Sequence, residues 1–98
     1  MHMNIRHYRV PPAQAEEIVR RVDDLWLEKI RRMRGFVSYH VVRDAEDRLT
    51  SMSAFVDEAD AKAAGEASAE WVGAALQDMD IEFLEQWDGP VVVHAGGG

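Results

Sequence analysis

The polar side chains in the middle of the chain are the first candidates for chemistry. They lie in residues 35–42 and 49–57, where Val, Phe, Tyr, Thr and Ser predict the paired strands of a hairpin. With Arg43 opposite Arg48, one face of this hairpin carries Ser38, His40, Ser51 and Ser53. His40 is the member of this group that changes charge near neutral pH. Two interpretations follow: hydroxyls that bond to backbone or water, or the floor of a small-molecule pocket.

Two aromatic residues join His40 and Ser51 as candidate ligand-binding residues. Tyr39 lies on the other face of the hairpin in this register, and a slip of one residue would exchange the two faces. Trp71 is the largest residue on the buried side of a predicted helix. It either fills the core there or walls a pocket beneath the helix.

Hydrophobic periodicity predicts the elements that position these residues. Residues 3–10 alternate as a first strand, which Pro11 and Pro12 end. Residues 13–34 form a long helix with apolar side chains every third or fourth position, and Gly35 is its natural stop. The predicted buried stripe of this helix is Ala15, Ile18, Val22, Leu25, Trp26, Ile30 and Met33.

A second helix begins after Asp57, which is a typical N-cap, and runs to about Leu76. Its predicted buried stripe is Ala61, Ala64, Ser68, Trp71, Ala75 and Leu76. Part of residues 78–87 reads as a strand, although the spacing of Met79, Phe83, Leu84 and Trp87 would also suit a short helix. Residues 88–90 read as a break and residues 91–94 as a short final strand. We expect residues 95–98 to form a flexible tail.

This order predicts an α+β fold, a ferredoxin-like βαββαβ antiparallel sheet with two helices on one face. Neither hairpin face is strongly charged, so both faces should be covered. One layer of helices covers only one of them. A second copy of the chain is the economical cover for the other, and a homodimer is therefore expected.

Composition narrows the functional classes. The chain has 98 residues, which predicts one domain spanning 1–98, and its net charge of −7 argues against nucleic acid or anionic membrane as partner. Without cysteine it has neither a disulfide nor a thiolate metal site, and it shows no signal-peptide core. We expect a cytoplasmic protein. The histidines lack metal-ligand spacing and no phosphate loop is present, so neither a metal nor another cofactor is predicted.

Several segments together resemble a known superfamily. They are Arg-x-Tyr near the start, Gly35-Phe36-Val37-x-Tyr39 after the long helix, Ser51 to Phe55, Ala69-Glu70-Trp71-Val72, and the terminal Gly-Pro-Val-Val-Val-His94. The pattern is similar to small dimeric α/β-barrel proteins of the antibiotic-biosynthesis-monooxygenase-like superfamily. That resemblance implies a homodimer in which two sheets pack face to face, with a pocket between sheet and helices in each subunit.

Two alternative functions follow, the first from the resemblance and the second from an interior of mostly Ala, Val, Met and Ser, which offers few groups able to do chemistry. One is a cofactor-independent monooxygenase or related small enzyme acting on a hydrophobic or aromatic metabolite, with Asn4, His40 and Trp71 as candidate catalytic residues. The other is a non-catalytic protein that binds a small molecule or has an accessory role. The second helix has no His, which haem-degrading members of the superfamily carry there, so haem degradation is not expected.

Overall fold

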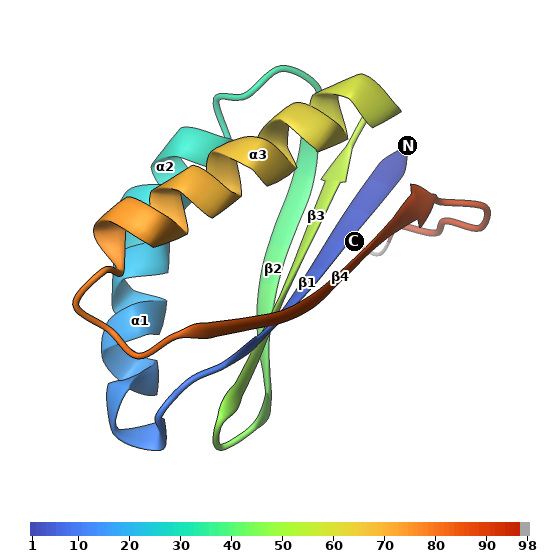
Figure 1. Cartoon of the computed structure of the whole chain (residues 1–98). Helices are drawn as coiled ribbons and strands as arrows, with labels where there is room; N and C mark the ends of the chain where they lie inside the picture. Colours follow the sequence, from blue (N-terminus) through green and yellow to red (C-terminus); the bar gives the residue numbers. More distant parts are fainter. Residues whose placement is uncertain (97–98) are drawn as a thin grey trace.

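The computed structural model describes residues 1–96 and has the order of elements that the sequence predicts, except for the short final strand. Its main elements are β1 (His2–Arg9), the first helical segment, β2 (Phe36–Ala45), β3 (Arg48–Phe55), α3 (Glu58–Ala75) and β4 (Glu82–Pro90). The strands form an antiparallel sheet in the order β2-β3-β1-β4. The helices cover one side of this sheet and leave the other side open (Figure 1). The predicted ferredoxin-like α+β fold is confirmed.

The first helical segment changes geometry along its length. It begins as a 3₁₀ turn, continues as α1, widens into a π-helical turn and ends as α2; the bounds are η1 (Pro12–Gln14), α1 (Ala15–Arg21), η2 (Val22–Trp26) and α2 (Leu27–Ile30). A π turn adds a residue and so changes which side chains face inward. Trp26 and Ile30 are buried, whereas Leu25, which the sequence placed in the buried stripe, is half exposed.

Helix α3 begins and packs as predicted. The Asp57 carboxylate accepts a hydrogen bond from the Asp60 backbone N–H at 2.9 Å, which caps the helix. Ala61, Ala64 and Trp71 are buried on its inner side. Small residues near the start and Trp71 near the end let one straight helix cover two different parts of the sheet.

The first helical segment is shorter than the predicted 13–34, since it ends at Ile30. Gly35 is therefore not its stop but lies in the turn before β2, in a conformation that favours glycine. Its φ is +76°, and a Cβ at this position would collide with the Asp60 carboxylate. The Gly35 carbonyl accepts a hydrogen bond from the Val56 N–H at 2.8 Å. This residue therefore joins the entry to β2 with the exit from β3.

The predicted register of the hairpin is wrong over its middle. Phe36 does lie opposite Phe55, but irregularities follow Phe36 and Val42, and each adds a residue to β2. The pairs in between are therefore Tyr39 with Ser53, His40 with Met52, Val41 with Ser51 and Val42 with Thr50; the turn pairs Ala45, not Arg43, with Arg48. The slip exchanges the faces, so Tyr39 shares the helix side with Ser51 and His40 does not.

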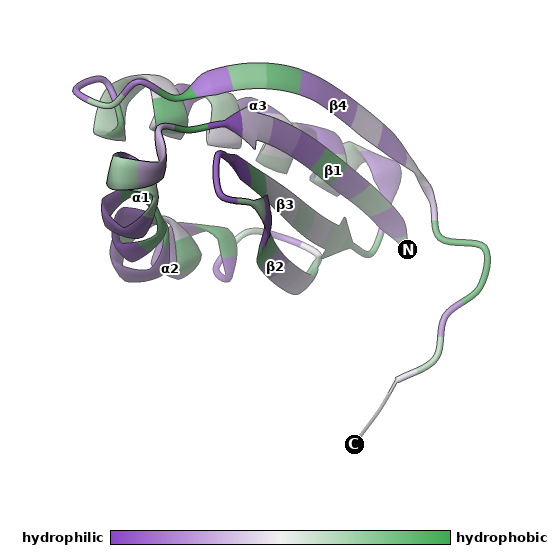
Figure 2. Ribbon diagram, turned by 90° about the horizontal axis from the view of Figure 1, so that it is seen from below, coloured by the Kyte–Doolittle hydropathy of each residue, from purple (hydrophilic) through white to green (hydrophobic). Residues whose placement is uncertain are grey.

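The C-terminal segment also differs from the prediction. Residues 88–90 belong to β4 and are not a break, and residues 91–94 form no strand within this chain. Figure 2 shows the segment leaving the body of the domain, and Val92 and Val93 are 88% and 86% exposed. Of the expected tail, Gly97 and Gly98 lie outside the described residues.

Candidate functional site

A small cavity lies between the sheet and the helices. Its volume is about 40 Å³, and its walls come from β1, β2, β3, the first helical segment, α3 and the start of the β4 region. The lining residues that matter most here are Tyr8, Trp26, Tyr39, Ser51, Ser68 and Trp71. Ligand pockets usually enclose about 300–1,000 Å³, so the cavity as it stands has room only for water-sized molecules.

Tyr39 is the main polar group of this cavity. Burial raises the pKa of its hydroxyl well above the usual range, and the neighbouring Tyr8 adds to the rise. Hydrogen bonding to Ser51 and Trp26 lowers that pKa by a smaller amount. The phenol therefore stays protonated at neutral pH and can donate a hydrogen bond, but it cannot act as a base there.

Two indoles close the cavity on the helix side. The Trp26 and Trp71 rings have centroids 5.7 Å apart with 35° between their planes, which is within the usual range for aromatic pairs. Both side chains are buried. Trp71 therefore both fills the core and walls a cavity, the two roles that the sequence left open.

The structure brings together three of the candidate residues and separates two. Tyr39, Ser51 and Trp71 all line the cavity. His40 lies beside Met52 on the open side of the sheet, because of the bulge after Phe36. Asn4 is buried on the helix side but lines a different hollow, next to α3 and β4.

That second region is a polar network on β1 and β4. The Asn4 amide donates to the Ala61 carbonyl at 2.8 Å and accepts from the Gln86 amide at 3.1 Å. The Arg6 guanidinium donates to the Tyr8 hydroxyl at 2.7 Å and to the Gln86 side-chain oxygen. Arg6, Tyr8 and Gln86 are not among the site residues predicted from the sequence. The alternation of residues 2–9, which puts Asn4, Arg6 and Tyr8 on one face, was the available signal.

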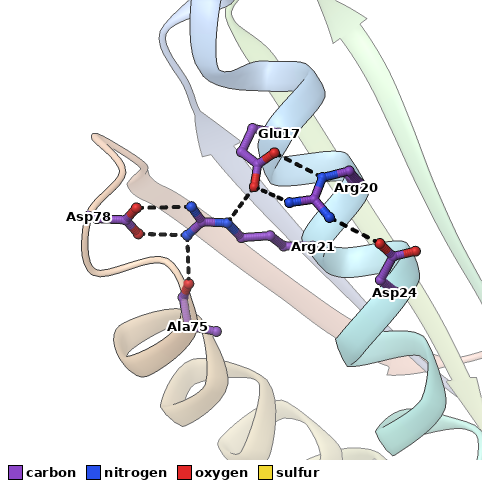
Figure 3. A network of polar contacts seen from close by, with 6 residues as sticks. All are labelled: Glu17, Arg20, Arg21, Asp24, Ala75 and Asp78. Atoms are coloured by element: carbon purple, nitrogen blue, oxygen red, sulfur yellow. Dashed lines mark hydrogen bonds and ion pairs between the residues drawn. The ribbon is translucent and has the colours of Figure 1, made fainter.

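A set of ion pairs ties the first helical segment to the end of α3. Arg21 donates to Asp78 in a bidentate pair at 2.6 and 2.9 Å and to the Ala75 carbonyl at 3.0 Å (Figure 3). Glu17 accepts hydrogen bonds from both Arg20 and Arg21. These contacts lower the pKa of Glu17 to about 2 and also lower the pKa of Asp78. Because Val22 and Leu76 line the cavity, the ion pairs fasten the helices beside one end of it.

Within residues 1–96, no group of three His, Asp or Glu side chains gathers as a metal site requires. The same residues contain no helix with the length and apolar character needed to cross a membrane.

Comparison with known proteins agrees with this geometry. A four-stranded antiparallel sheet with helices on one side defines a ferredoxin-like domain. The family model for antibiotic biosynthesis monooxygenase matches residues 1–73. The chain therefore belongs to the antibiotic biosynthesis monooxygenase family.

Solved structures with low sequence identity share the fold. HapK from Hahella chejuensis is 20% identical with a TM-score of 0.78, and the match covers 100% of both chains. A dimeric ferredoxin-like protein from an uncultured marine organism is 13% identical with a TM-score of 0.75, over 98% of both chains. SnoaB, a cofactor-independent oxygenase from Streptomyces nogalater, is 16% identical with a TM-score of 0.67, over 95% of this chain and 94% of that one. No curated protein sequence matches the chain at a significant level.

Proposed function

We propose that this chain is a homodimeric small-molecule-binding or accessory protein of its family, which holds a small hydrophobic ligand between the sheet and the helices. The supporting observation is the buried cavity that Tyr39, Ser51 and Trp71 line. Aromatic and aliphatic walls with a few polar groups are typical of ligand sites. The Tyr39 hydroxyl and the Ser51 hydroxyl are the groups that would orient a polar substituent of the ligand.

Binding is favoured over catalysis because of what the cavity lining contains. None of its residues is a His, Asp, Glu or Lys. Its partly buried Tyr39 has a pKa raised far from neutrality, which makes it a poor general base. The 40 Å³ volume also means that a ligand must displace the walls before it fits.

The alternative is a cofactor-independent monooxygenase acting on a hydrophobic or aromatic metabolite. Its support is the family, the fold shared with SnoaB, and the aromatic side chains of Tyr39 and Trp71 in one cavity. Dioxygen uptake by the purified protein with the bound metabolite, and a product containing one added oxygen atom, would favour this alternative. It would also end the accessory interpretation.

The ligand is tested by native mass spectrometry of the protein purified from its own host. We expect a dimer that carries a small organic molecule. The Tyr39→Phe and Ser51→Ala variants should lose part of this molecule, because each removes a polar group of the cavity. His40→Ala is the matched control and should retain it, since His40 lies on the other side of the sheet. A wild-type dimer without adduct, or an adduct lost equally in the control, would count against the cavity.

The homodimer is supported by the open side of the sheet. Ile5 and Met52 lie on this side, and Trp87, beside Ile5, is 58% exposed there. The edge of the His7 ring contacts the Trp87 ring, with centroids 5.3 Å apart. Exposed apolar surface of this kind marks interaction sites, and one similar solved structure is described as dimeric.

The dimer is tested by sedimentation of the Trp87→Arg variant. A charge within an apolar interface should shift the protein to monomer. Leu25→Arg is the control, because Leu25 is an equally exposed apolar residue on the helical side. A Trp87→Arg protein that stays dimeric would show that the dimer interface does not lie on the open side of the sheet.

A further inference from the structure

A second hollow, larger than the cavity, lies between α3 and β4 and is called the Arg6 groove here. Its volume is about 530 Å³, within the usual range for ligand pockets. One face of α3 lines it at helical spacing, through Glu58, Lys62, Gly65, Glu66 and Ala69, and β1 and β4 supply Asn4, Arg6, Gln86 and Asp88. The groove shares none of these residues with the cavity of the proposed function.

Arg6 is a buried cation held by neutral groups. Its exposed fraction is 9%, and its guanidinium carbon lies 4.5 Å from the centroid of the Phe83 ring. Its hydrogen bonds go to the Tyr8 hydroxyl and the Gln86 amide oxygen. Among residues 1–96 no carboxylate forms an ion pair with it. A buried charge is costly unless it is paired, so the groove offers a place where an anionic partner would stabilise Arg6.

The charges around the groove restrict that partner. Arg6 and Lys62 contribute two positive charges, and Glu58, Glu66 and Asp88 contribute three negative charges. The lining therefore carries a net charge of −1, which repels a multiply charged anion. A guanidinium also has the geometry to hold a carboxylate through paired hydrogen bonds.

We propose that the Arg6 groove is a second ligand site, which binds the single carboxylate of a small organic acid through Arg6. The Gln86 amide holds the guanidinium in place, and Gly65 and Ala69 leave room for the rest of the ligand. The site does not depend on the cavity, so either one can exist without the other.

The test uses benzoate as the probe and amide chemical shifts of the full chain as the readout. We expect saturable shifts centred on Arg6, Lys62 and Gln86. Benzyl alcohol, which has the same ring but no carboxylate, should bind about tenfold or more weakly, because it lacks the charge-assisted hydrogen bonds. Inorganic phosphate should bind more weakly than benzoate because of its additional charge.

Three variants decide the outcome. Arg6→Gln should abolish the benzoate shifts. Because Arg6 is buried, this variant risks misfolding, so a second variant is needed. Ala69→Leu fills the groove from an exposed helix position and should weaken benzoate binding by about tenfold. Ala63→Leu is the matched control on the other exposed flank of α3 and should bind as the wild type does.

Certain results would overturn the second site. These are the absence of saturable shifts, equal binding of benzyl alcohol or phosphate, and unchanged binding in Ala69→Leu. Shifts centred on Tyr39 and Trp71 would also overturn it, but they would support the cavity of the proposed function. The two ideas therefore fail separately.

Discussion

The helix-covered side of the sheet has two halves that are stabilised in different ways. The half on β2 and β3 is largely apolar: Val41 and Leu49 line a cavity with Trp26 and Trp71, and Phe36 packs against Phe55. The half on β1 and β4 is polar, with Asn4, Arg6 and Gln86 joined by hydrogen bonds. Helix α3 spans both halves. Large residues of α3 cover the first, and small ones cover the second.

This difference shows how one helix of 18 residues can cover two kinds of surface. Over the apolar half, Trp71 fills space and leaves a cavity of about 40 Å³. Over the polar half, Gly65 brings α3 so close that a Cβ would lie 3.1 Å from the Asn4 side-chain nitrogen. Packing should therefore dominate the stability of the first half, and hydrogen bonding that of the second.

The largest expected effect is in the apolar half. Trp71→Ala should lower the free energy of unfolding by about 3–5 kcal/mol, because it removes a buried indole and leaves a large cavity. Urea unfolding at one fixed protein concentration measures this, since dimerisation makes stability depend on concentration. Leu25→Ala, at an exposed position, should lower the free energy of unfolding by less than about 0.5 kcal/mol. Similar costs for both variants would contradict the role of packing.

Sequence patterns predicted the order of the elements because each has a clear local cause. The Asp57 cap and the small-residue stripe of α3 are short-range features, and the structure confirms them. The predicted stop at Gly35 is wrong, because α2 ends at Ile30. Alternation along β1 likewise puts Asn4, Arg6 and Tyr8 on one buried face, since side chains alternate within a strand.

The wrong predictions lie where one inserted residue changes the face of a strand or helix on which the following side chains lie. The bulges in β2 moved His40 to the open side and Tyr39 to the cavity. The π turn in the first helical segment exposed Leu25. Neither insertion has a clear signal in residue types, because each depends on packing with distant strands. Whether Tyr39, Ser51 and Trp71 bind a ligand remains a prediction, and the structure shows only that they meet in one cavity.

The second prediction concerns the hydrogen bonds of the polar half. Asn4→Ala should lower the free energy of unfolding by about 1–3 kcal/mol, because the buried Ala61 carbonyl loses the amide that donates to it, and Gln86 loses a partner as well. A double-mutant cycle with Gln86→Ala should give a coupling energy of about 0.5–1.5 kcal/mol, measured by urea unfolding. Additive effects of the two substitutions would mean that the network contributes little and that the halves differ less than the contacts indicate.

A smaller effect is expected where α3 approaches Asn4. Gly65→Ala should lower stability by about 1 kcal/mol, because the new methyl group pushes on an amide that two hydrogen bonds hold in place. Gly73→Ala is the matched control, since a Cβ there meets no atom within 4 Å. The control should raise stability by up to about 1 kcal/mol through helix propensity.

Gly65→Ala should stabilise the protein, instead of destabilising it, once the Asn4 side chain is removed. In an Asn4→Ala background the obstruction is gone, so Gly65→Ala should then stabilise the protein by up to about 1 kcal/mol. Thermal unfolding of the four proteins in this cycle measures the change. If Gly65→Ala stabilises the wild type as well, α3 has room to move and the close contact does not limit it.

The smallest expected effect is at the exposed ion pairs that join the helices. Arg20 and Arg21 lower the pKa of Glu17 to about 2 from an ordinary value of 4.5. A carboxyl group whose pKa is lower in the folded state stabilises the protein above its unfolded pKa, and this contribution is lost as pH falls through the folded value. Stability should therefore decrease between about pH 4.5 and pH 2. The Glu17→Gln variant should show a flatter pH profile over that range. At neutral pH the stabilities of the two proteins should differ only slightly, because surface ion pairs are weak. Identical stability profiles in acid would show that Glu17 does not help to hold α1 against the end of α3.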